Sequence, residues 1–121
     1  PTFLQQARDP DGRVIEELGP EEQSKVISKE AADQLTQMMQ KVTEEGTAAG
    51  LSVDGVSFAG KTGTAEIRLE DRTNQPWFIA FAPTDDPQIA VAATVERCQG
   101  CFGGDTAGPI ATAVMENLLG K

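Results

Sequence analysis

The prediction of the fold depends on the stretch VSFAGKTGTAEI, from Val56 to Ile67, which can be interpreted in two ways. From Gly55 the chain spells GVSFAGKT, which fits the pattern G-x-x-x-x-G-K-[ST] of a phosphate-binding loop. Such a loop follows a buried strand and opens a helix whose N-terminal amides hold the phosphates. The preceding AAGLSVDG has no long apolar run, and the following GTAEIRLEDRTN suits an extended chain better than a helix start. We therefore interpret the stretch as a β-strand, and a nucleotide-binding fragment stays open as a remote alternative.

As a strand, the stretch alternates cleanly between two faces. The glycines at positions 60 and 63 would let the backbone of a ligand come close to it. One face of this strand carries Ser57, Ala59, Lys61, Gly63 and Ala65.

Two further strands are expected after it. The ranges 56–67, 76–82 and 88–95 predict an antiparallel meander of three strands joined by polar turns. The segment WFIAFA is apolar on both faces, which predicts a sheet covered on both sides, with Trp77 packed in the core or at an edge. In QIAVAATVE, the small residues Ala90, Ala92 and Thr94 form a face that suits close approach of a helix.

Two helices are predicted from apolar residues spaced three and four apart. Ser28 is a good N-cap for a helix over 28–45, and Asp105 or Thr106 can cap a second helix over 106–119. The methionines are expected to fill the core. The apolar stripe of the first helix is Ala31, Ala32, Leu35, Met38, Met39 and Val42, and the packing stripe of the second is Ile110, Ala113, Val114, Asn117 and Leu118.

The N-terminal part is expected to form a hairpin. TFLQQAR and RVIEEL flank Asp9-Pro10-Asp11-Gly12, in which proline presets φ and glycine accepts a positive φ. The expected elements together predict an α+β fold with helices packed on an antiparallel sheet. In chain order they are a hairpin and linker (1–20), a helix (28–45), the sheet (56–95) and a second helix (106–119).

Composition excludes several classes of function. Nineteen acidic and ten basic residues give a net charge of −9, which opposes nucleic acid and anionic membrane surfaces as partners. The chain has no histidine, which excludes Ser-His-Asp and Cys-His catalysis within it. No stretch of 18 apolar residues is present to span a bilayer.

The two cysteines, Cys98 and Cys101, form one C-x-x-C pattern. The pair could be half of a zinc site, a redox pair or a local disulfide. A second pair or a histidine to complete four zinc ligands is missing from the sequence, so we expect no metal site. A disulfide is the leading interpretation if the domain lies outside the cytoplasm.

The flanks of Lys61-Thr62-Gly63 carry a resemblance to a known family. Three segments carry it, in the order AGKTGTAEI, NQPWFIAFAPTDDPQIAVAATVE and GGDTAGPIATAVMENLL. They resemble the end of the transpeptidase domain of class B penicillin-binding proteins, and the resemblance extends over this chain from about Asp9 to Leu119. KTG is one of three short motifs shared by these proteins and the serine β-lactamases. The resemblance implies the C-terminal portion of their common fold, in which this chain would supply the last three strands of a five-stranded sheet.

The resemblance also implies roles for the motif residues. Lys61 and Thr64 would be catalytic, the first as the motif cation and the second through a backbone N–H of the oxyanion hole. Thr62 and Gly63 would bind substrate. The substrates and ligands implied are peptidoglycan stem peptides and β-lactams, with no cofactor, in a parent protein anchored to the membrane and facing out of the cytoplasm.

One departure from the family limits this prediction. None of the serines, Ser24, Ser28, Ser52 and Ser57, begins an S-x-x-K or S-x-N motif. We therefore expect the nucleophile upstream of Pro1 and no turnover by this chain alone. A non-catalytic binding or scaffolding module that keeps the KTG region is the alternative. In the family fold the strand at 88–95 would lie beside a strand that this chain lacks. We therefore expect the fragment to dimerise, by pairing of that edge or by exchange of its hairpin or terminal helix, or to cover the edge with its hairpin.

Overall fold

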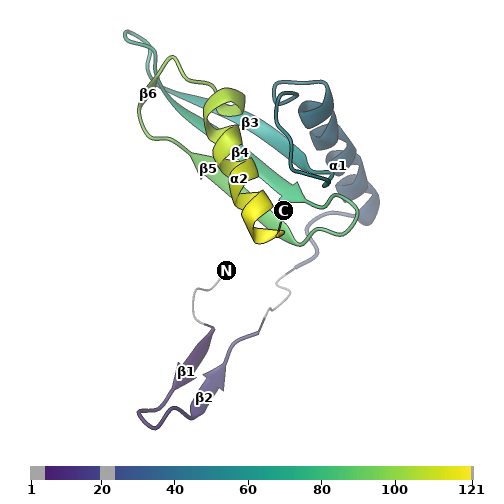
Figure 1. Cartoon of the computed structure of the whole chain (residues 1–121), viewed down its shortest axis with the longest axis vertical. Coiled ribbons are helices and arrows are strands. Elements are labelled where there is room, and N and C mark those ends of the chain that lie inside the picture. The colour runs from purple at the N-terminus through teal and green to yellow at the C-terminus, as the bar shows by residue number, and fades with distance from the viewer. Residues whose placement is uncertain (1–4, 20–23, 121) are drawn as a thin grey trace.

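The computed structural model describes residues 5–19 and 24–120, and Figure 1 shows how its elements are arranged. A short hairpin of β1 (Gln6–Arg8) and β2 (Val14–Glu17) stands apart from the main sheet (Figure 1). Its turn forms where it was predicted, because the Asp9 carboxylate accepts hydrogen bonds from the N–H groups of Asp11 and Arg13, and Gly12 takes a φ of 83°. The part of the predicted hairpin before Gln5 lies outside the described residues.

The main sheet is antiparallel, with β4 (Thr73–Ala82) between β3 (Ala59–Arg68) and β5 (Ile89–Thr94). This confirms the predicted meander. The prediction missed β6 (Cys98–Gln99), which pairs with the start of β4, so the described residues form a sheet of four strands.

The strand β4 begins three residues earlier than predicted, at Thr73. The cause is local, because the Asp71 carboxylate accepts hydrogen bonds from the N–H and the hydroxyl of Thr73 and closes the turn after β3. The hydrogen bond from the Thr73 hydroxyl also holds the pKa of Asp71 below its ordinary value. Asn74 is buried there and donates to the carbonyl of Cys101, 3.1 Å away.

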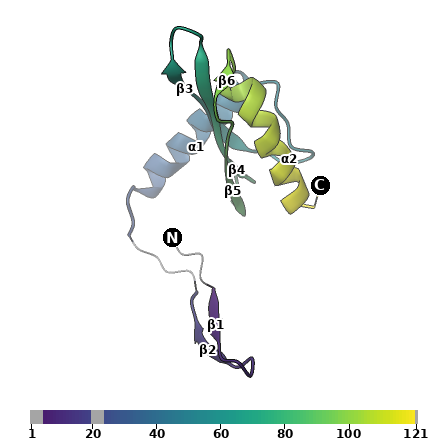
Figure 2. The same cartoon turned by 90° about the vertical axis from the view of Figure 1, so that its left-hand side faces the viewer.

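The core lies between the sheet and α2 (Gly108–Leu118). Its sheet side consists of Phe78, Ala80, Ala82 and Ala93, and its helix side of Ala111 and Met115. Figure 2 shows the second long helix, α1 (Lys29–Glu44), on the opposite side of the sheet from α2. The prediction that both faces are covered was only partly right, because Trp77 and Ile79 on the α1 side are 39% and 48% exposed.

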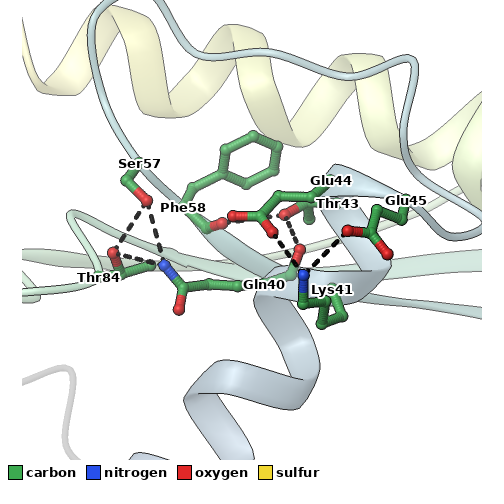
Figure 3. A network of polar contacts seen from close by, with 8 residues as sticks. All are labelled: Gln40, Lys41, Thr43, Glu44, Glu45, Ser57, Phe58 and Thr84. Atoms are coloured by element: carbon green, nitrogen blue, oxygen red, sulfur yellow. Dashed lines mark hydrogen bonds and ion pairs between the residues drawn. The ribbon is translucent and has the colours of Figure 1, made fainter.

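The helix α1 begins after Ser28, whose hydroxyl accepts from the N–H of Ala31 as an N-cap. Its predicted apolar stripe was wrong in part, since Leu35 and Met38 are 47% and 60% exposed. The hydrogen bonds that join α1 to the sheet region come from its C-terminal half, beyond Leu35 and Met38. There Thr43 donates to the carbonyl of Phe58 (Figure 3).

A polar network fixes this end of α1 to the start of β3 and to the β4–β5 turn (Figure 3). The amide of Gln40 donates to the hydroxyls of Ser57 and Thr84, at 3.2 and 3.1 Å. The Thr84 hydroxyl donates to Ser57, and the Thr84 N–H donates to the Ser57 carbonyl. These bonds set where β3 starts, and therefore where the KTG residues lie along the sheet edge.

The predicted cap and packing face of α2 were both wrong. Asp105 and Thr106 lie inside a π-helical turn, Gly103–Ala107. The helix α2 follows this turn directly, and no side chain of the described residues caps it. The buried face is Gly108, Ala111, Thr112 and Met115, whereas the predicted residues Ile110, Val114 and Leu118 are exposed. Gly108, Ala111 and Thr112 let the helix come close to the sheet, and Met115 fills the core beside them. This face packs against Ile89, Val91 and Ala93 of β5 rather than against the predicted Ala90, Ala92 and Thr94.

Candidate active-site strand

The residues Lys61 to Thr64 occupy the middle of β3, paired with Ile79, Phe78, Trp77 and Pro76 of β4. Within the part of the chain that the structure describes, β4 is the only strand that pairs with β3. The other edge of β3 therefore presents its backbone N–H and C=O groups outward. An edge of this kind can bind an extended peptide by strand addition.

The side chains of Lys61 and Thr62 lie on opposite faces of the sheet, since successive residues of a strand alternate. Lys61 shares its face with Ile79 and is exposed. Its ammonium donates to the carbonyl of Thr62, at 2.7 Å, and no carboxylate of residues 5–19 or 24–120 forms an ion pair with it. The charge of Lys61 is thus available to a ligand or to a group from elsewhere.

Thr62 shares its face with Phe78 and is half-buried, in contrast to the exposed Thr64. Its hydroxyl lies 2.8 Å from the hydroxyl of Thr47, which belongs to the turn after α1. Two hydroxyls at this distance share a hydrogen bond. The structure therefore brings one residue from outside the motif into contact with a predicted substrate-binding residue.

The π-helical turn before α2 packs directly on the motif. A Cβ atom on Gly103 would collide with the carbonyl of Trp77 and lie 2.6 Å from the carbonyl oxygen of Gly63. A Cβ atom on Gly104 would collide with the carbonyl of Thr47. These glycines are needed because backbone meets backbone here.

The cysteine loop leads into this turn. Cys98 and Cys101 are joined through sulfur in the structure, with Cα atoms 5.6 Å apart, and Cys98 belongs to β6. Since the Cys101 carbonyl accepts from Asn74, the loop is fixed to β4 just before it reaches Gly103. Among the described residues, no cluster of three or more Cys, Asp or Glu side chains could hold a metal ion.

The structure contradicts the nucleotide-binding alternative. GKT lies within β3, which continues as a strand to Arg68, so no helix opens where phosphates would need its N-terminal amides. Sequence reasoning identified the motif but missed Thr47 and the two glycines that pack on it. The adjacent glycines in GGDT were a usable signal for close backbone contact, whereas Thr47 gave none.

The fold and the site define an α+β unit with a motif-bearing strand exposed at the edge of its sheet. Comparison with known proteins places it in a family, because the model of the penicillin binding protein transpeptidase domain matches residues 1–116. The chain belongs to this family, and its relatives are class B penicillin-binding proteins.

Two curated relatives show how much of such a protein the chain represents. It is 36% identical over 124 residues to peptidoglycan D,D-transpeptidase PbpA of Mycolicibacterium smegmatis. This match covers 98% of this chain and 25% of that protein. It is 33% identical over 113 residues to stage V sporulation protein D of Bacillus subtilis, covering 88% of this chain and 18% of that protein. The chain thus spans about a fifth to a quarter of the length of these relatives.

Solved structures of penicillin-binding proteins have the same fold as this chain. The crystal structure of PBPA from Mycobacterium tuberculosis matches with a TM-score of 0.79 at 34% identity, over 95% of this chain and 27% of that one. The imipenem acyl-enzyme complex of penicillin-binding protein A from M. tuberculosis matches with the same TM-score at 33% identity, over 95% of this chain and 25% of that one. The α+β fold is therefore that of the penicillin-binding transpeptidase domains.

Proposed function

We propose that this chain is the KTG-bearing portion of a serine D,D-transpeptidase that acts on peptidoglycan stem peptides and is acylated by β-lactams. The observation that carries the proposal is the position of Lys-Thr-Gly on a strand edge that pairs with no strand of residues 5–19 or 24–120, in a chain related to transpeptidases. Acyl-enzyme complexes of a homologue with imipenem and penicillin G support the same chemistry. The nucleophilic serine and its partner motif would come from a part of the protein outside this chain.

Lys61 is the proposed cation of the site. A transferred acyl group passes through a tetrahedral species that carries negative charge, and preorganised positive groups stabilise that charge. The exposed ammonium of Lys61 has no carboxylate partner among the described residues, so its charge can act on a serine hydroxyl or on the ligand. Its present contact with the Thr62 carbonyl is a single hydrogen bond, which such a partner can replace.

The other three motif residues are assigned to binding and to the oxyanion. The N–H of Thr64 would donate to the developing oxyanion, a contribution of about 3–4 kcal/mol for one donor in other acyl-transfer enzymes. Thr62 would donate its hydroxyl to the carboxylate of the substrate or the β-lactam. Gly63, which has no side chain, leaves room for the substrate backbone beside the strand.

The location of the parent protein is part of the same proposal. Stem peptides lie outside the cytoplasm, so the domain would face that side, held by a membrane anchor elsewhere in the protein. Neither α1 nor α2, the long helices of the described chain, is long and apolar enough to cross a membrane.

Labelling with a fluorescent penicillin tests the proposal in the intact protein that carries this chain. Lys61→Ala should slow acylation by about 10²–10³-fold, the effect of losing one electrostatic group in comparable sites. Lys29→Ala is the matched control, because that lysine pairs with Asp33 on the exposed side of α1. Labelling of the Lys61 variant at the wild-type rate would refute the role of Lys61, and an unlabelled wild type would favour a binding or scaffolding module.

A further inference from the structure

Thr47 lies outside the KTG motif yet touches it. It belongs to the turn that follows α1, and its neighbour Ala48 is buried in the core. Two backbone hydrogen bonds fix this turn, from the N–H of Ala48 to Val42 and from the N–H of Ala49 to Gly46. The position of the Thr47 hydroxyl, 2.8 Å from that of Thr62, is therefore set by the fold rather than by chance contact of mobile side chains.

The π-helical turn before α2 also packs against the contact between Thr47 and Thr62. Gly104 of the π-helical turn packs so closely on the Thr47 carbonyl that a Cβ atom would collide with it. The same Cβ would lie 3.5 Å from the Cγ2 methyl of Thr62. Thr62 is thus confined between the turn after α1 and the turn before α2, with its hydroxyl directed toward Thr47.

We propose that Thr47 is a positioning residue that orients the Thr62 hydroxyl for the carboxylate of the substrate. The inference rests on the proposed function, in which Thr62 binds that carboxylate. A hydroxyl has one proton to donate and two lone pairs to accept with. If Thr62 gave its proton to Thr47, no donor would remain for the anion.

A bound carboxylate therefore fixes the direction of the chain of hydrogen bonds. Thr47 donates to Thr62, and Thr62 donates to the carboxylate, which can only accept. Bonds in such a chain polarise one another, and the last bond is the stronger for being charge-assisted. Removal of the Thr47 hydroxyl should weaken recognition of the carboxylate specifically, with little effect on ligands that lack one.

The test compares two penicillins in the intact protein, one with its free carboxylate and one as the methyl ester. Thr47→Val keeps the shape of the side chain and removes the hydroxyl. We expect the acylation rate constant with the free acid to fall about fivefold to tenfold, which corresponds to about 1–1.4 kcal/mol. The rate constant with the ester should change less than twofold. The ratio of the two is independent of how much of the variant is folded.

Three further variants sharpen the result. Thr47→Ser should restore the ratio, because it restores the hydroxyl. Thr36→Val is the matched control, since its hydroxyl donates to the carbonyl of Ala32 within α1 rather than to a motif residue. In a Thr62→Val background, Thr47→Val should have no additional effect, because the hydrogen-bond chain is already broken.

Other outcomes separate the failure of this inference from the failure of the proposed function. Equal loss of both rate constants in Thr47→Val, or no loss of either, would overturn the role of Thr47 while leaving the transpeptidase assignment intact. A wild-type protein that is acylated by neither compound would overturn the proposed function, and the role of Thr47 with it.

Discussion

Single glycines decide how closely the rest of the chain approaches the KTG strand. A Cβ on Gly60 would lie 2.6 Å from the ring of Phe78, the largest buried side chain of the core. Gly103 and Gly104 bring the turn before α2 against the backbone of β3, β4 and the turn after α1. The motif strand is therefore held by backbone contacts that a single methyl group would disturb.

This packing makes Gly103→Ala a sharp test at the residue scale. The added methyl would collide with the Trp77 carbonyl and crowd the backbone of Gly63, neither of which can move without distorting the sheet. We expect a loss of about 1–3 kcal/mol in the free energy of unfolding, the usual cost of overpacking a closely packed site. Denaturant unfolding followed by fluorescence of Trp77, the single tryptophan of the chain, measures it.

Gly50→Ala is the control for this prediction. A Cβ there meets nothing within 4 Å, and its φ lies outside the positive range that disfavours side chains. Its stability should match that of the unaltered chain or exceed it slightly, because alanine lowers the entropy of the unfolded chain. If both variants are equally stable, the turn does not pack on the motif as closely as described.

The elements show what the sequence could and could not predict. Alternation and turn residues were enough to predict β3, β4 and β5, and Ser28 marked the start of α1 correctly. The packing face of α2 was wrong because the helix has apolar residues on both sides. Periodicity favoured Ile110, Val114 and Leu118, whereas the helix turns a different side, with Ala111 and Met115, toward the sheet.

In the candidate site, too, the sequence predicted some features and missed others. The KTG residues could be identified because they are adjacent in sequence and lie on one strand. Thr47 could not be, since its contact with Thr62 joins residues 15 positions apart and depends on the path of the turn after α1. The strand β6 was also missed. Two residues give no periodic pattern, and its pairing with Thr73 and Asn74 exists only once β4 is in place.

At the scale of one element, the link between Cys98 and Cys101 remains a prediction for solution. The ring is small, with a sequence separation of 3, so the stabilisation should be below the roughly 3 kcal/mol estimated for a 15-residue loop. Protein handled in air should take up no alkylating reagent until it is reduced, as intact mass will show. Cys98→Ser, the control, should take up one adduct without reduction. Two free thiols in the unreduced protein would contradict the disulfide.

The whole molecule exposes apolar surface in more than one place. Trp77 and Ile79 lie open on the α1 side of the sheet, and Ile110, Val114 and Leu118 lie open on the outer side of α2. The outer edge of β5 has no partner strand among the described residues, and the hairpin of β1 and β2 pairs only within itself. Such faces and edges favour association with another chain.

We therefore predict that the 121-residue chain, prepared alone, forms dimers in solution through the β5 edge. Ala90, Ala92 and Thr94 are small and exposed, so a second copy can approach the strand closely. The net charge of −9 opposes association, and salt screens that repulsion, with a Debye length of about 8 Å at physiological ionic strength. The dimer fraction measured by light scattering should therefore rise with protein concentration and with salt.

A charged residue placed on the β5 edge distinguishes edge pairing from non-specific association. Ala92→Lys places a cation on exposed β5, the means by which natural edge strands resist pairing, and should shift the equilibrium to monomer. Ala49→Lys, in the exposed turn after α1, adds the same charge away from the edge and should leave the dimer in place. If both variants lower association equally, net charge or the apolar faces control it instead. A monomer at every concentration, with fast amide exchange along 89–94, would mean that the edge stays open and that unpaired backbone groups do not suffice to join two copies.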